Sequence, residues 1–278
     1  MKKIIFLILV TALITGCSND QYAIERRYYR LSKQAGKIFA NPHVSPPQEL
    51  ERVVKLLNSF AKKYPKSNLA LDAEFNIARL YIVKEEYAKA RAYLKQLLNQ
   101  YSAQSKAISS EIIFLMGNSF EIENKWGLAL EQYKKIMQEY PLTIRGINVP
   151  IYIAQHYKIK YQPDKMIASY QEAISHYKAL AAQYPGSPLG FNTEALAAQC
   201  YIAMKEWGNA IDTFNNLIAA YKSKINLDAV MLDMALIYQR ELKDNVKAKE
   251  TLEKLIKDYP KSRLVKIANE LLKKVDEK

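Results

Sequence analysis

The residue types that most often carry out catalysis are few in this chain. Its three histidines, His43, His156 and His176, do not form the His-Glu-x-x-His spacing of a zinc hydrolase. The sequence has no Gly-x-Ser-x-Gly nucleophile turn and no phosphate-binding loop. An acidic pair such as Glu85-Glu86 falls where a turn is expected, so water would solvate it. These observations predict a protein that is not an enzyme and that uses no metal or cofactor.

The two cysteines predict different chemistry. Cys200 lies on an apolar helical face beside Tyr201, which is typical of an inert buried thiol. Cys17 instead follows a segment with the features of a leader peptide, a basic start and then an apolar run. Its basic start is Lys2-Lys3, and the apolar run over residues 4–14 is too short to cross a bilayer comfortably.

The four residues Ile14-Thr15-Gly16-Cys17 resemble the bacterial lipobox. This resemblance implies cleavage of residues 1–16 as a signal peptide, attachment of lipid (palmitate among it) to Cys17, and a short tether over residues 17–21. Ser18 follows the cysteine, which in such lipoproteins implies an anchor in the outer membrane, facing the periplasm. Multiple acyl chains hold a protein stably. The alternative is a plain N-terminal membrane anchor.

The chain is strongly basic, with a formal net charge of +13. Loss of Lys2 and Lys3 with the leader would leave +11. A basic surface attracts nucleic acid, anionic lipid or an acidic protein. An anchored envelope protein seldom meets nucleic acid, so we expect no nucleic-acid partner. The remaining interpretations are a solvated lysine-rich exterior, an envelope polyanion or an acidic partner.

A short Tyr-Pro motif recurs along the chain at nearly regular intervals. It occurs at tyrosines 64, 140, 184 and 259, with weaker copies that lack proline at 101 and 221. Successive tyrosines are 37 to 44 residues apart, a period that indicates a repeat array. The tyrosine ends an amphipathic helix and proline prevents its continuation. Glycine is scarce and hairpin signals are absent, which argues against a β fold.

Within the full repeats, a small residue is followed by an aromatic residue three positions later and by a second small residue twelve positions later. The pairs of small residues are Ala78 and Ala90, Gly117 and Ala129, and Ala198 and Ala210. The pattern resembles the tetratricopeptide repeat. The resemblance implies two antiparallel helices per repeat and an all-α fold, a right-handed α-solenoid.

Two repeats depart from this spacing. In the third, the interval between the small residues Ala154 and Ala173 is longer by seven residues, which equals about two helical turns. We therefore expect longer helices there, the second beginning at Pro163. In the fifth repeat we place one extra residue in the turn at 243–245.

The parts of the chain follow from these patterns. Residues 22–49 form an N-terminal helix and a proline-rich loop, and residues 50–278 form about five repeats and a capping helix over 264–275. The segment 50–64 acts as a second helix without a full first one. The outer face of the N-terminal helix is either an ordinary wet surface or a contact for anionic head groups; its basic residues are Arg26, Arg27, Arg30, Lys33 and Lys37.

A lipobox followed by repeats with Tyr-Pro-x-Ser phrases resembles the BamD type of outer-membrane assembly lipoprotein. It is also similar to the repeat domain of the CpoB/YbgF type. The first resemblance implies a non-catalytic, lipid-anchored scaffold in outer-membrane protein assembly. The alternatives are a periplasmic coordinator of cell division or peptidoglycan synthesis, and an accessory module in envelope polysaccharide export.

In tetratricopeptide arrays the partner usually binds along the concave face, which the outward positions of each first helix form. Aromatic groups, amides and cations at these positions suit an extended or helical peptide of an envelope protein. The predicted partner-binding residues are Phe75, Arg79, Phe114, Asn118, Gln155, Lys158, Gln199 and Gln239.

Overall fold

The structure is a computed structural model of the chain. It describes the backbone of residues 2–222 and 224–276, and the side chains of residues 21–222 and 224–275. All the regular secondary structure in this part of the backbone is helical, without strands, and the helices pack in chain order. The predicted all-α solenoid of helix pairs is confirmed.

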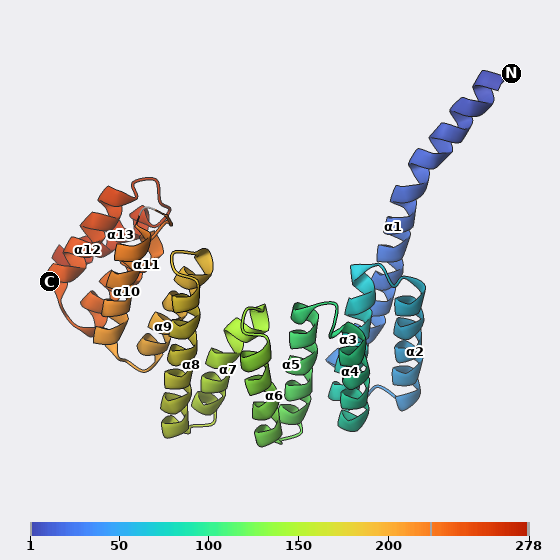
Figure 1. Ribbon diagram of the computed structural model, residues 1–278, viewed down its shortest axis with the longest axis horizontal. Helices are drawn as coiled ribbons and strands as arrows, with labels where there is room; N and C mark the ends of the chain where they lie inside the picture. The colour runs from blue at the N-terminus through green and yellow to red at the C-terminus, as the bar shows by residue number, and fades with distance from the viewer. Residues whose placement is uncertain (1, 223, 277–278) are drawn as a thin grey trace. The chain divides into compact units, whose positions relative to one another are not determined.

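The chain divides into two compact units, residues 1–145 and 146–278, each described by itself. Within each unit, successive helices run in alternating directions (Figure 1). Unit 1 contains α1 (Lys2–Ala40), α2 (Pro47–Lys63), α3 (Asn68–Val83), α4 (Tyr87–Tyr101), α5 (Lys106–Ile122), α6 (Trp126–Glu139) and the first two residues of α7 (Ile144–Ile159). Unit 2 contains the rest of α7, α8 (Pro163–Gln183), α9 (Pro188–Ala203), α10 (Trp207–Tyr221), α11 (Asp228–Leu236), the π-helical turn η1 (Ile237–Glu241), α12 (Asn245–Asp258) and α13 (Val265–Asp276).

The N-terminal helix α1 is longer than the sequence predicts. Its helical backbone includes residues 18–20, where we expected a tether. The predicted signal peptide and the lipidation site Cys17 lie outside the described side chains. Among the described residues, none of the helices combines the length and the apolar character needed to span a bilayer.

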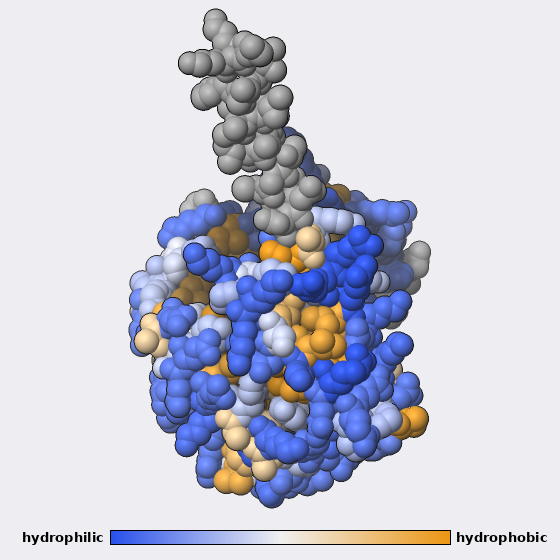
Figure 2. Space-filling model, turned by 90° about the vertical axis from the view of Figure 1, so that its right-hand side faces the viewer, coloured by the Kyte–Doolittle hydropathy of each residue, from blue (hydrophilic) through white to orange (hydrophobic). Residues whose placement is uncertain are grey.

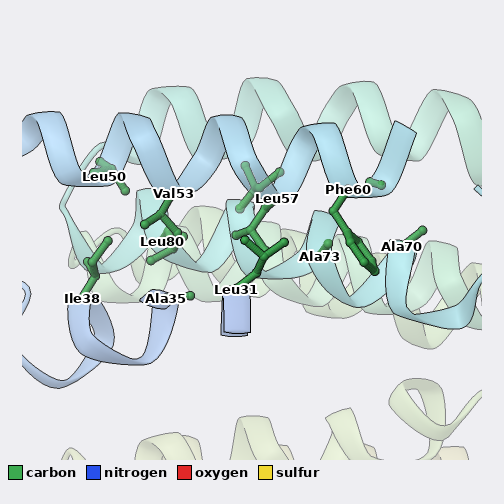
Figure 3. Close-up of a cluster of buried hydrophobic side chains, with 12 residues drawn as sticks. Leu31, Ala35, Ile38, Leu50, Val53, Leu57, Phe60, Ala70, Ala73 and Leu80 are labelled. Atoms are coloured by element: carbon green, nitrogen blue, oxygen red, sulfur yellow. The ribbon is translucent and has the colours of Figure 1, made fainter. Parts of the chain in front are cut away.

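The C-terminal half of α1 completes a helix pair with α2. Leu31, Ala35 and Ile38 are buried against α2 and α3, and Figure 3 shows them pointing toward Val53 and Leu57. Helix α2, predicted as a second helix without a full first one, therefore has the C-terminal half of α1 in the place of its first helix. The sequence pattern did not identify α1 as a first helix, because α1 lacks a small residue at the repeat spacing that marks the other first helices.

The opposite face of α1 is exposed, as its basic residues predict. All five predicted basic residues are exposed to solvent, and so are Tyr22 and Tyr29. Figure 2 looks onto this end of the chain and shows a mostly hydrophilic surface around small hydrophobic patches.

From α3 onward, each turn between a first and a second helix has the same unusual backbone. Its last-but-one residue adopts a positive φ, between 54° and 62°, although it is never glycine; these residues are Glu85, Asn124, Tyr161, Lys205 and Lys243. In the first four turns, the next backbone N–H donates to the carbonyl five residues earlier, as Glu206 does to Tyr201 at 2.9 Å. This is the Schellman helix ending, which satisfies carbonyls that the helix leaves unpaired.

The additional residues of the irregular third repeat lie in its second helix. Helix α8 begins at Pro163 and has 21 residues, as predicted, whereas the second helices α4 and α10 have 15. Helix α7 has 16 residues, like α3 and α9, so the prediction that both helices are longer is wrong for the first. The extra residues extend the start of α8, where Pro163 sits at a position that needs no backbone donor.

The extra residue of the fifth repeat lies before the turn, not in it. The π-helical turn η1 absorbs it at the end of the first helix. The hydrogen bond that closes this helix joins Asp244 N–H to the carbonyl of Tyr238, six residues earlier instead of five. A π-turn inserts one residue into a helix, which preserves the turn that follows. Our placement of the insertion at 243–245 is corrected accordingly.

Candidate interaction surface

The first helix of the second repeat carries a glycine where the second helix places a large ring. A Cβ atom added to Gly117 of α5 would lie 2.5 Å from ring atom Cε1 of Tyr133 on α6. Tyr133 is fully buried, and its hydroxyl donates to Glu121 at 2.8 Å. The glycine thus lets a large ring fill the space between the helices and fixes its position.

This ring supports Phe114, one of the predicted partner-binding residues. The centroids of Phe114 and Tyr133 lie 5.4 Å apart. On Phe114 also lies the guanidinium of Arg145, with its Cζ 3.8 Å from the ring centroid. Phe114 is only partly buried. A partly exposed aromatic ring that is held by an aromatic and a cationic neighbour is a pre-ordered contact for a partner.

Glu111 joins the cations of neighbouring helices on the same surface. Arg145 donates to it twice, from Nε at 2.6 Å and from Nη2 at 3.0 Å. Arg79 of α3 lies 3.7 Å from the same carboxylate. The side chains of Glu111, Arg145 and Arg79 are 22%, 33% and 43% exposed. A bidentate, partly shielded pair of this kind fixes geometry better than a fully exposed one.

Asn118 extends this surface by one helical turn beyond Phe114. Residues four apart lie on the same face of a helix, and Asn118 is half-buried. Among the described side chains and backbone groups, none hydrogen-bonds with its amide. The amide therefore remains available to a ligand. We call Arg79, Glu111, Phe114, Asn118 and Arg145 the first-helix face of unit 1.

Phe75 does not lie open on this face. Its side chain is 7% exposed and packs with Leu94, Leu97 and Ile112 in the core. Only an approach of Arg79, with Cζ 5.8 Å from the ring centroid, connects it with the surface. The prediction of an exposed contact at Phe75 is wrong, because this position faces the second helix of its own repeat as well as the next repeat.

The four predicted residues of unit 2 do not form a comparable cluster. Gln155 and Lys158 of α7 and Gln199 of α9 are exposed, and Gln239 in η1 is partly buried. In the part of the chain that the structure describes, no hydrogen bond or ion pair joins any of these four to another. Their role in binding stays a prediction.

The side chains that could take part in catalysis do not belong to this surface, and their surroundings do not activate them. Cys200 is fully buried, and burial raises the pKa of its thiol to about 12, so the unreactive thiol form dominates at neutral pH. Burial lowers the pKa of His176, which a nearby Glu172 opposes. Over the residues with described side chains, no three His, Cys, Asp or Glu groups converge as metal ligands do.

Comparison with known families supports the repeat pattern. The tetratricopeptide repeat family model matches residues 72–103, 196–223 and 229–262. These three segments are similar to tetratricopeptide repeats. The three matches correspond to α3 with α4, to α9 with α10, and to α11 with α12. The second repeat, which carries most of the first-helix face of unit 1, lies outside the matched segments.

The solved structures to which this chain is similar are distant in sequence. BtubC from P. vanneervenii is 14% identical, with a TM-score of 0.42, over 86% of this chain and 91% of that one. The C-terminal part of a TPR repeat-containing protein from Cytophaga hutchinsonii is 16% identical, with a TM-score of 0.44, over 82% and 79%. The TPR2AB domain of yeast Sti1, in complex with pHSP90, is 13% identical, with a TM-score of 0.33, over 90% and 98%. The comparison with curated proteins found no match.

Sequence reasoning missed two members of the face, Glu111 and Arg145. Glu111 lies three residues before Phe114 and so shares its side of a helix, which the repeat pattern alone indicates. Arg145 follows the Tyr140-Pro141 phrase, at the start of the next first helix. Its contact with α5 depends on how consecutive repeats pack, and no single-repeat pattern carries that information.

Proposed function

We propose that the protein is a non-catalytic interaction scaffold and that it holds an extended segment of a partner protein on the first-helix face of unit 1. The observation that carries this proposal is the pairing of a fixed, partly exposed ring, Phe114, with the unpaired amide of Asn118 one turn away. A ring provides apolar contact area at a small entropic cost, and an amide can bind the backbone of an extended peptide.

The charges of this face favour a partner segment of mixed character. Arg145 and Arg79 are already neutralised in part by Glu111. A strongly acidic peptide would therefore have to compete with Glu111 for both cations. A segment that places an apolar side chain on Phe114 and its own amide groups against Asn118 meets no such competition.

The location and the pathway form the second part of the proposal. We propose that Cys17 is lipidated and anchors the chain at the periplasmic side of the outer membrane, and that the partner belongs to outer-membrane protein assembly, as in the BamD type. The lipobox and the Tyr-Pro-x-Ser phrases support this. A Cys17→Ala variant should then lose the mass of the acyl groups and leave the membrane fraction; an unchanged intact mass would contradict lipidation.

The partner can be tested by crosslinked capture from membranes. We expect an assembly protein to be captured by the wild type and lost in an Arg79→Ala/Asn118→Ala variant. These two side chains are partly exposed, so the fold should survive. A matched control is Lys95→Ala/Gln138→Ala, which removes an exposed cation and an exposed amide from α4 and α6.

The other outcomes separate the remaining hypotheses. Capture of division or cell-wall proteins would replace the assembly role with the coordinator role. Binding of a polysaccharide without any protein partner would contradict the scaffold. If the partner is lost equally in the control variant, the first-helix face of unit 1 is not the binding site.

A further inference from the structure

Three grooves of similar construction lie between successive second helices, each with a first helix as its floor. The Glu74 groove lies between α2 and α4 over α3, with a volume of about 420 Å³. The Glu194 groove lies between α8 and α10 over α9, with about 390 Å³. The Met231 groove lies between α10 and α12 over α11, with about 330 Å³. The three are named after the residue at one shared position.

That shared position comes four residues before the small residue of each first helix. The fold accepts an apolar side chain there, since Met231 is 2% exposed and Ile113, its counterpart in the second repeat, is 1% exposed. Glutamates at 74 and 194 are therefore not required by packing. Burial disfavours the charged form of both glutamates and so raises the pKa of both carboxyl groups. A carboxylate placed where packing does not need it is a candidate binding group.

The chain itself satisfies Glu74 but not Glu194. The hydroxyl of Tyr101 donates to Glu74 at 2.8 Å. Tyr221 has the place of Tyr101 in the Glu194 groove, but its hydroxyl interacts with the backbone of Gly186. Among the residues with described side chains, none hydrogen-bonds or forms an ion pair with Glu194. The carboxylate thus lines the groove without a described hydrogen-bond or ion-pair partner, although burial and, after it, this nearby carboxylate raise the pKa of the Tyr221 hydroxyl.

The walls of the Glu194 groove also differ from those of its counterpart. Thr213 stands where the Glu74 groove has Tyr93, and Ala220 stands where it has Gln100. Short apolar side chains line much of the rest; they are Ala181, Ala182, Pro185 and Ala197. This lining suits an unbranched aliphatic chain that ends at the carboxylate.

One cation of the protein itself, Lys178, lines the same groove. Its ammonium group donates to the hydroxyl of Tyr201 at 3.0 Å and lies 5.3 Å from the centroid of that ring. These contacts hold it on Tyr201, and it forms no ion pair with Glu194 within 4.0 Å. The groove therefore offers an apolar channel, one uncommitted negative charge, and the polar groups of Thr213 and Asn216 beside it.

We propose that the Glu194 groove binds the side chain of a lysine from a partner protein. The aliphatic stem lies against the alanines, and the ammonium group pairs with Glu194 and donates to the oxygens of Thr213 and Asn216. A partly enclosed carboxylate binds an ammonium ion more strongly than a fully solvated one does. This site belongs to unit 2, where it lies between the second helices α8 and α10 over the first helix α9, and it shares no residue with the first-helix face of unit 1.

Carbon-13 NMR of the full-length chain labelled at glutamate carboxyl carbons tests the proposal. The probe is N-acetyl-lysine N-methylamide, and its apolar control is the norleucine analogue, which has the same stem without the ammonium group. Glu194→Gln and Glu74→Gln assign the two signals. We expect the lysine compound to shift the Glu194 signal saturably and to leave the Glu74 signal unchanged, because Tyr101 already binds Glu74.

Two variants make the result decisive. Because Glu194→Gln lacks the Glu194 carboxyl signal, its binding is followed on the proton signals of the lysine compound, and it should be weaker at least about tenfold, which corresponds to about 1.4 kcal/mol. Thr213→Tyr should also abolish binding, because it places in the groove the side chain that its counterpart has, while it keeps the charge of Glu194. The proposal is overturned if the norleucine analogue causes the same shift, if the lysine compound causes no saturable shift, or if Glu194→Gln binds as well as the wild type.

Discussion

The contact between Gly117 and Tyr133 gives the sharpest prediction for stability. Replacing Gly117 with alanine puts a Cβ atom 2.5 Å, 2.9 Å and 3.0 Å from three atoms of the Tyr133 ring. The ring cannot easily retreat, because it is fully buried, packs at a tilt against Phe114 and is hydrogen-bonded to Glu121. The substitution should therefore overpack the interface between α5 and α6.

Two opposing effects set the size of the change. Overpacking in a rigid core costs about 1–3 kcal/mol. Alanine is favoured over glycine inside a helix by about 1 kcal/mol. We therefore expect Gly117→Ala to lower the free energy of unfolding by about 1 kcal/mol. Gly127 and Gly208, which have no neighbours within 4 Å of an added Cβ, are matched controls in which only the helical preference acts.

A second substitution tests the cause. Two other repeats combine alanine at this position with leucine opposite it: Ala78 with Leu94, and Ala235 with Leu252. In a Tyr133→Leu background, Gly117→Ala should no longer destabilise and should gain about 1 kcal/mol from helical preference. The coupling energy of this double-mutant cycle should then be about 2 kcal/mol.

Urea denaturation followed by fluorescence measures these changes. Trp126 lies 5.9 Å from the Tyr133 ring, so it reports on this repeat, and Trp207→Phe removes the other tryptophan signal. The m-value should stay constant within the series. If Gly117→Ala is as harmless as Gly127→Ala, or if leucine at 133 does not relieve it, the close approach is not what this glycine provides.

Three further predictions follow from the backbone, the ion pair and the buried thiol. Lys205→Gly should raise the free energy of unfolding by up to about 1 kcal/mol, because glycine tolerates the φ of 61° at this turn; a loss of stability would count against the strain. Arg145→Lys should cost about 1 kcal/mol, because lysine cannot bind Glu111 through two hydrogen bonds, whereas Lys135→Ala in an exposed pair should have no measurable effect. The pKa of Cys200 is raised from 9.0 to about 12, so the stability that the neutral thiol contributes is fully present below pH 9 and is lost as the pH rises toward 12. The difference in stability between wild type and Cys200→Ala should accordingly shrink between about pH 8 and about pH 10.5, and a constant difference would show that the thiol does not ionise as inferred.

The helix pairs were predictable from sequence because the pattern that predicts them is local. A Tyr-Pro phrase ends a helix whatever its neighbours are, and small residues twelve positions apart specify two helices that approach closely. The start of α8 was predicted for the same reason, since Pro163 marks a helix start by itself, whereas nothing local showed that α7 keeps the ordinary length. The π-turn η1 carries no such local mark, and the sequence pattern therefore placed the extra residue in the following turn.

The candidate surface was less predictable because it depends on packing between repeats. Phe75 and Phe114 occupy the same position of successive repeats, but the first is buried and the second is stacked at the surface. The difference comes from Arg145 and from the Gly117–Tyr133 contact, which belong to other helices. The pairing of α1 with α2 was missed for the same reason, since only their shared core shows it.

Site-specific photo-crosslinking in cells tests the central claim, that the first-helix face of unit 1 holds a partner. A photoreactive phenylalanine analogue at Asn118 reports on this face, and the same analogue at Gln138, an exposed residue of α6, is the control. The account predicts a crosslink from position 118 to one outer-membrane assembly protein and none from position 138. A crosslink to that protein from position 138 alone, or equal crosslinks from both positions, would contradict it.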